Sequence, residues 1–180
     1  MDNSTEGVTL LAAFVNDVLK NYEDKRQDYQ GLFDLTKGHD LSKPTILVPM
    51  KLYNDACGWI ETNLGKFNLI RIGRNVGETA YEVMLTNRMI DDKSTPLDVI
   101  KALVLVAQTA IQDPKQRGWK IMGHTSKSIS LRRTQTFNSK LQLGLLDGLV
   151  RKSGATGVRV EFTKEIELGS EFDEYIIHWI

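Results

Sequence analysis

The spacing between apolar residues changes after residue 118, and this change constrains the fold more than any other feature of the sequence. Before it, apolar residues recur every three or four positions, which is typical of amphipathic helices. After it, they alternate with polar residues in four short segments, as in half-buried strands, around one further helical stretch. The sequence therefore predicts an α+β protein in which an N-terminal helical part packs on a C-terminal β-β-α-β-β antiparallel core.

Four helices are expected in the first part. An apolar stripe over 8–22, preceded by the N-cap candidates Asn3, Ser4 and Thr5, predicts the first. The turn-rich stretch 37–44 then leads into a short apolar run that Pro49 ends. Two more helices are expected over 51–64, with Gly65 as the C-cap, and over about 72–89.

The clearest helix start lies at Thr95. Its hydroxyl can accept a hydrogen bond from a first-turn amide, Pro96 needs no N–H at that position, and Asp98 faces the positive end of the helix. The helix is apolar on more than one side and should therefore be central. Asp113-Pro114 is expected to end it.

The second part is predicted to be two hairpins flanking a helix. Alternating segments begin at Trp119 and Ile129, and two more run over 158–162 and 172–180, while the stripe of a helix spans 141–150. We expect one domain, 1–180, made of a helical part, 1–113, and a β-β-α-β-β part, 118–180.

Composition narrows the class of protein. The chain has 180 residues, 41% of them apolar, and its 23 basic and 23 acidic residues give a formal net charge of zero. A globular protein is expected, without a global field that attracts nucleic acid or anionic lipid. Neither a signal peptide nor a membrane span is evident, so we expect a cytoplasmic protein with no membrane partner.

Two pairs of glycines lie four residues apart, at Gly73 and Gly77 and at Gly144 and Gly148. Neither pair fits a phosphate-binding loop, because a spacing of four residues gives neither G-x-G-x-x-G nor G-x-x-x-x-G-K-S/T. Both pairs fall in expected helices, where a glycine allows another backbone to approach. They therefore predict close helix packing.

No residues are predicted to be catalytic or to bind a metal. His39, His124 and His178 fall in different elements and show no metal-ligand spacing, and Cys57 sits beside Trp59 without a basic neighbour, as a buried thiol does. No nucleophile motif is present. Nothing argues for an enzyme, although the question stays open.

Charge is distributed unevenly in the second half. The stretch 114–146 holds seven basic residues and no acidic one, whereas 161–174 holds six acidic residues against one lysine. The favoured interpretation is that the two sets neutralise each other across strands. The alternative, a basic face for a phosphate-bearing partner, lacks the interleaved aromatic residues of a nucleic-acid site, and nucleic acid is disfavoured.

One stretch carries the mixture of groups that small-molecule pockets use. Tyr53, Trp59 and Tyr81 offer flat apolar surfaces on consecutive expected helices, and Arg71 and Arg74 offer oriented donors. We predict that these five residues line a pocket between the two parts of the chain. The expected ligand is small and apolar or anionic.

The order of elements and several C-terminal segments resemble a known superfamily. The segments are 143–150, 158–162, Gly169 and 175–179, and the superfamily includes haem nitric-oxide-binding sensor domains, 4-vinyl reductase domains and Golgi transport subunits. In the haem-binding branch the resemblance implies a proximal histidine on the helix before the first hairpin and a Tyr-x-Ser-x-Arg motif. Here that helix has no histidine, and the motif positions are Leu131, Arg133 and Gln135.

The sequence thus predicts a non-catalytic small-ligand-sensing or regulatory module on this scaffold, without its iron or metal ligands. No cofactor is predicted. One alternative is a haem or tetrapyrrole sensor that uses another ligand, such as His39 or His124. A second is a pure association module, which predicts a stable homodimer without a pocket between the two parts. A homodimer and a signalling protein are the partners considered besides the ligand.

Overall fold

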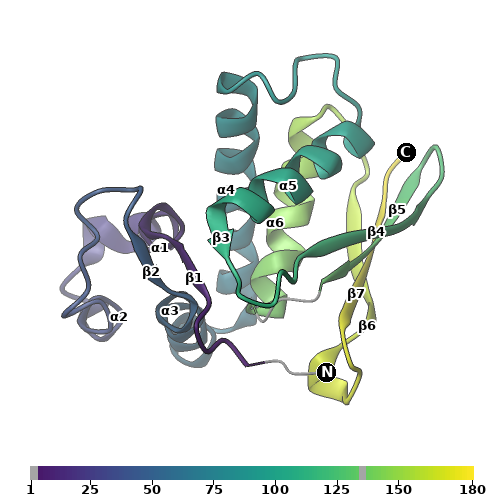
Figure 1. Ribbon diagram of the computed structural model, residues 1–180. Coiled ribbons are helices and arrows are strands. Elements are labelled where there is room, and N and C mark those ends of the chain that lie inside the picture. The colour runs from purple at the N-terminus through teal and green to yellow at the C-terminus, as the bar shows by residue number, and fades with distance from the viewer. Residues whose placement is uncertain (1–3, 134–136) are drawn as a thin grey trace.

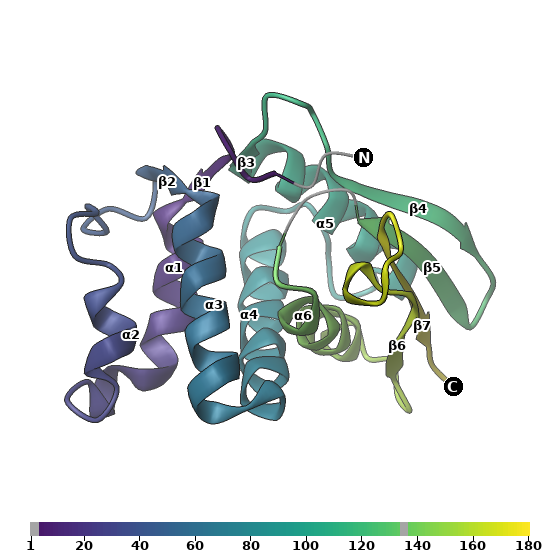
Figure 2. The same ribbon diagram turned by 90° about the horizontal axis from the view of Figure 1, so that it is seen from below.

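The computed structural model describes residues 4–133 and 137–180. Helices α1, α2 and α3 lie on one side and a four-stranded antiparallel sheet on the other, with α4, α5 and α6 between them in both views (Figures 1 and 2). The expected α+β class is confirmed. Within the described ranges, no helix combines the length and the apolar character needed to cross a membrane.

The first part contains more elements than expected. They are β1 (Thr9–Leu11), α1 (Ala12–Leu19), the 3-10 helix η1 (Lys20–Lys25), α2 (Gln30–Asp34), β2 (Leu47–Pro49), α3 (Met50–Leu64), α4 (Lys66–Thr86), α5 (Pro96–Ala110) and β3 (Ile111–Gln112). The second part contains β4 (Trp119–His124), β5 (Ser128–Arg133), α6 (Ser139–Lys152), β6 (Arg159–Lys164), the 3-10 helix η2 (Ile166–Leu168) and β7 (Asp173–His178).

The expectation of a helix from the start of the chain is wrong. Strand β1 occupies the middle of a small antiparallel sheet with β2 and β3 as its neighbours, and the helix begins only at Ala12. Gly7 adopts a positive φ of 73°, which breaks a helix, and Leu10 is completely buried within the small sheet. Pairing with distant strands thus outweighs the local helical period. Asn3 lies outside the described residues.

Other boundaries differ where neighbouring elements compete. Gly65, at a φ of 87°, ends α3 as predicted, and α4 begins at the next residue instead of at about 72. Helix α5 ends before Asp113, because Ile111 leaves the helix and pairs with Leu10. Its start agrees with the prediction, since the Thr95 hydroxyl accepts a hydrogen bond from the Asp98 amide at 3.3 Å.

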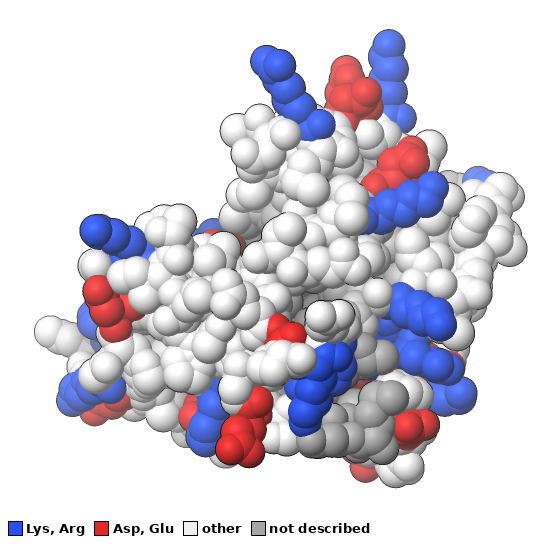
Figure 3. Space-filling model, in the orientation of Figure 1, with Lys and Arg blue, Asp and Glu red and all other residues white. Residues whose placement is uncertain are grey.

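The predicted β-β-α-β-β order of the second part is confirmed. Its strands lie in the order β4-β5-β7-β6, all antiparallel. The register places Arg132 of β5 opposite Glu174 of β7, and their side chains form an ion pair of 2.6 Å. Arg133 and Asp173, the next pair along the same strands, are also ion-paired at 3.3 Å, which supports the interpretation that the two sets of charges neutralise each other across strands. On the face shown in Figure 3, charged side chains of both signs are scattered among uncharged ones.

The glycine pairs mark the crossing of α4 and α6, as predicted. A Cβ atom built on Gly144 would collide with the carbonyl oxygen of Ile70, and one built on Gly73 would collide with that of Leu141. Gly77 and Gly148 meet the facing backbone in the same way. The two helices therefore touch backbone to backbone, which only glycine permits.

Candidate ligand-binding site

A cavity of about 180 Å³ lies where the two parts of the chain meet. Helices α4 and α5 supply the largest share of its described lining, and the rest comes from α1, α3, α6, the start of β4, Leu11 of β1, Ile111 of β3 and Phe137. Most of the lining is aliphatic or aromatic, and Ala107, Leu103 and Leu145 are examples from α5 and α6. The glycine crossing of α4 and α6 holds two of these helices in close contact beside the cavity.

Two buried side chains bring polar groups to this apolar cavity. Tyr53 of α3 is 1% exposed and Gln142 of α6 is 3% exposed, and both line the cavity. No hydrogen bond joins the Tyr53 hydroxyl or the Gln142 side-chain amide to another described residue, and neither belongs to the fully enclosed polar atoms without a partner, which among the described residues are the Tyr22 hydroxyl and Nε and Nη1 of Arg133. Burial raises the pKa of the Tyr53 hydroxyl well above its usual value, so the phenol stays neutral.

The charged residue of the lining is Asp17 on α1. Its carboxylate pairs with Lys20 at 2.6 Å, and a quarter of its side chain is exposed. The Lys20 ammonium also donates a hydrogen bond to the hydroxyl of Thr79, another lining residue, at 3.1 Å. These contacts place the ion pair at the solvent side of the cavity. The interior is therefore uncharged over the described part of the lining.

The structure brings one of the five predicted pocket residues to the cavity, namely Tyr53. Trp59 packs against Tyr29, with ring centroids 6.5 Å apart, and Tyr81 is buried below Lys152. Arg71 donates to the side chain of Asn68 at 3.0 Å.

Arg74 forms an ion pair of 2.5 Å with Asp147 of α6. With Trp59, Tyr81 and Arg71 it thus lies away from the cavity lining, and the ligand-binding role of these four residues stays a prediction. Sequence reasoning missed Gln142, whose signal was a polar residue inside the apolar stripe of its helix, and Trp119, which was assigned only to a strand.

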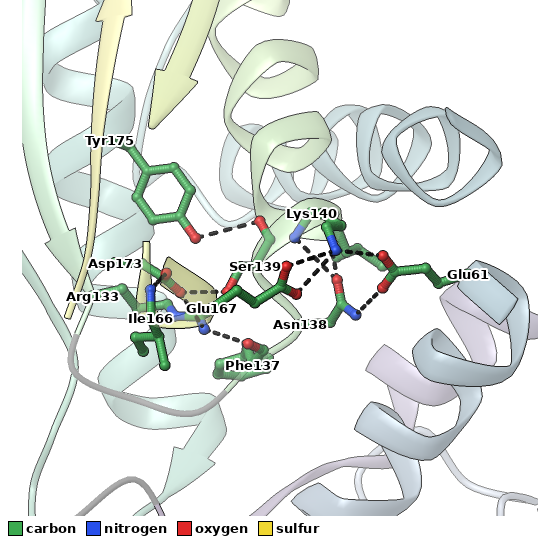
Figure 4. A network of polar contacts seen from close by, with 11 residues as sticks. Glu61, Arg133, Phe137, Asn138, Ser139, Lys140, Ile166, Glu167, Asp173 and Tyr175 are labelled. Carbon is green, nitrogen blue, oxygen red and sulfur yellow. Dashed lines mark hydrogen bonds and ion pairs between the residues drawn. The ribbon is translucent and has the colours of Figure 1, made fainter. Parts of the chain in front are cut away.

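A polar network surrounds the N-terminus of α6, next to the cavity (Figure 4). The Asn138 side chain accepts hydrogen bonds from the amides of Lys140 and Leu141, which caps the helix. The ammonium of Lys140 pairs with Glu61 of α3 at 2.6 Å and with Glu167 at 2.9 Å. The network thereby joins the helical part to the β-β-α-β-β part.

The buried side of the same network holds a further ion pair. Arg133 and Asp173 are completely buried, 3.3 Å apart, and Arg133 also donates to the carbonyl of Phe137. The Ser139 hydroxyl donates to Asp173 at 2.5 Å. Arg133 does not line the cavity, so it adds no cation to the ligand site. Gln135, the third position of the motif comparison, lies outside the described residues.

Haem, which the resemblance implies, does not fit this cavity. Its volume is below the range of about 300 to 1,000 Å³ that drug-sized ligands occupy. His39, His124 and His178 are exposed and lie away from it, and α5 offers Leu103, Val106, Ala107 and Ala110 at the wall. Tyr53 and Met84 line the cavity and are of residue types that ligate haem iron, but they do not provide the missing space.

The remaining described residues that could act as nucleophiles or metal ligands form no site. Cys57 is buried, and burial raises the pKa of its thiol, so the thiolate needed for reactivity is disfavoured. In the described ranges, no three histidine, cysteine or acidic side chains gather as a metal site would require.

Comparisons with known proteins point to one fold. No protein-family model matches the chain, and no curated protein matches it. Among solved structures, it is similar to an H-NOX domain from Shewanella oneidensis in the Fe(II)CO ligation state, with a TM-score of 0.68 and 10% identity over 94% of this chain and 98% of that one.

It is also similar to an H-NOX variant from T. tengcongensis, with a TM-score of 0.63 and 13% identity over 94% and 97% of the two chains. An H-NOX variant from K. algicida in the Fe(II) unliganded state gives a TM-score of 0.60 and 13% identity over 95% and 97%. The likeness thus spans both parts of the chain, and the chain has the H-NOX fold.

Proposed function

We propose that this chain is a non-catalytic sensing or regulatory module that binds a small, largely apolar molecule in the cavity between its two parts. The observation that carries the proposal is the lining itself, which combines apolar side chains of α1, α4 and α5 with those of α6 and β4. A molecule bound there touches both parts at once. Its presence would therefore favour one relative arrangement of the parts, as ligand sensing requires.

The cavity favours an apolar ligand over the anionic one that the sequence suggested. Asp17, the charged residue of the described lining, is acidic, and Arg74 is engaged with Asp147. A carboxylate or phosphate would lose its hydration without gaining a basic partner, which costs several kcal/mol. A small uncharged molecule meets no such penalty.

Trp119 offers a direct readout, because it lines the cavity and Trp59 does not. We expect toluene, used as a probe, to change the fluorescence of the wild-type chain, and we expect this change to disappear in Trp119→Phe. Ala107→Phe should fill the cavity and abolish binding measured by calorimetry. Ala155→Phe, a change of the same size outside the lining, is the control. Unaltered binding in Ala107→Phe would refute the proposal.

The haem alternative makes a separate prediction. A chain expressed with haem supply should be colourless and should not take up added haemin, since the cavity is too small and the three histidines lie elsewhere. A Soret band that is lost on mutation of His39 or His124 would support a haem sensor instead.

A pure association module is less well supported, because it predicts that the two parts enclose no pocket. Homodimerisation and a signalling partner stay predictions. Native mass spectrometry of freshly purified protein measures the number of subunits and any retained small molecule in the same experiment.

A further inference from the structure

Two polar residues, Tyr53 and Gln142, line the otherwise largely apolar cavity. Buried polar groups in proteins nearly always have hydrogen-bond partners. Both residues are almost completely buried and line the same cavity, and no hydrogen bond joins the hydroxyl or the amide to another described residue, although neither group is fully enclosed. A polar group that reaches the space of an apolar cavity and bonds to no other residue is open to a hydrogen bond from a molecule in that cavity. A cavity meant only for apolar contacts would gain from phenylalanine and leucine at these positions.

We infer that the cavity recognises a neutral, ring-sized molecule that carries a hydroxyl or carbonyl oxygen. This inference rests on the proposed function and specifies its ligand. The Gln142 amide can both donate and accept, and the Tyr53 hydroxyl can do the same, so either can pair with such an oxygen. The apolar remainder of the lining would surround the ring.

The size of the cavity sets the size of the molecule. At about 180 Å³ it is slightly larger than an engineered apolar cavity of about 150 Å³ that binds benzene. A six-membered ring with one or two substituents therefore fits, and a tetrapyrrole macrocycle does not. Phenol is the simplest probe with one ring and one hydroxyl.

The charge of the lining excludes an ionised ligand. No basic side chain is among the described residues that line the cavity, and Asp17 is already paired with Lys20. Benzoate has a ring of the same size but carries a full charge into this interior. It is therefore the natural negative probe, and toluene, which lacks the hydroxyl, is the probe for the apolar contribution alone.

The test is calorimetric titration of the wild-type chain with phenol, toluene and benzoate. We expect phenol to bind about tenfold more tightly than toluene, as one hydrogen bond in a buried site provides. Benzoate should not bind measurably. Gln142→Leu and Tyr53→Phe should each lower the phenol-to-toluene ratio, and at least one should bring it close to one, with toluene binding retained.

Controls separate this inference from loss of folding and from the proposed function. Gln108→Leu changes an exposed glutamine of α5 outside the lining and should leave the ratio unchanged. Far-UV circular dichroism checks that each variant folds. Equal affinities for phenol and toluene, with both variants unaffected, would overturn the inference and leave the proposed function standing. Absence of binding by both probes would overturn the two together.

Discussion

Replacing Gly144 with alanine should destabilise the fold, even though alanine favours a helix by about 1 kcal/mol over glycine. The reason lies in the crossing of α4 and α6. The added Cβ atom would lie 2.9 Å from the Cα of Gly73 and from the amide nitrogen of Arg74, and it would overlap the carbonyl oxygen of Ile70. All three are backbone atoms, so no side chain can rotate away.

The size of the effect follows from these contacts. Non-bonded carbon atoms prefer about 3.5 to 4.0 Å, so the helices would have to separate by about 1 Å. A gap of that size forfeits a quarter to a half of the dispersion energy of each contact that is opened. Overpacking costs about 1 to 3 kcal/mol, and this site belongs at the upper end because both sides are rigid. Subtracting the helix-propensity gain leaves a net loss of about 2 kcal/mol.

Gly58 provides a matched control in α3. A Cβ atom there would meet nothing within 4 Å, so Gly58→Ala gains helix propensity without a clash and should stabilise the chain by about 0.5 to 1 kcal/mol. Urea unfolding followed by far-UV circular dichroism measures both changes. Effects of the same sign at the two positions would refute the reasoning.

Three further predictions concern the core, acid stability and domain organisation. Leu103→Ala and Leu145→Ala, which truncate buried side chains, should each cost about 2 to 5 kcal/mol in urea unfolding, and losses below about 1 kcal/mol at both would contradict the packing described. The hydrogen bond from Arg132 lowers the pKa of Glu174, so the Glu174 carboxylate stabilises the fold above its unfolded-state pKa, and this contribution is lost as the pH falls through the lower folded-state pKa. The difference in unfolding free energy between wild type and Glu174→Gln should therefore shrink on acidification. A difference that stays constant with pH would contradict this role of Glu174. Finally, one domain predicts a single unfolding transition at which the Trp119 signal and the far-UV signal change together, whereas two separated transitions would indicate two domains.

The strand and helix types of the second part could be predicted from the sequence because their periods are local. Strands β5 and β7 bury alternate residues, and the apolar residues of the other segments recur in the sequence with the period of a strand or a helix. Strand β1 could not be predicted in this way. Its three residues are strand only because β2 and β3, distant in sequence, pair with it.

The candidate site was less predictable than the fold. Aromatic residues at helical spacing indicated a pocket, but the sequence does not show which side of a helix faces a cavity and which faces another helix. Tyr53 lines the cavity, whereas Trp59, only six residues later in the same helix, packs toward α2. Arg74 was a plausible ligand contact until Asp147, 73 residues away, proved to be its partner.

The crossing of α4 and α6 restricts which residues can occupy the four glycine positions in these helices. At 10 to 13% identity to the H-NOX structures named above, most positions have diverged without loss of the fold. A backbone-to-backbone contact admits no larger residue, whatever the cavity binds. Two Gly-x-x-x-Gly pairs, one on each helix, thus constrain the sequence of this chain independently of ligand chemistry. Searches for distant relatives of this chain can weight these four positions above the residues that line the cavity.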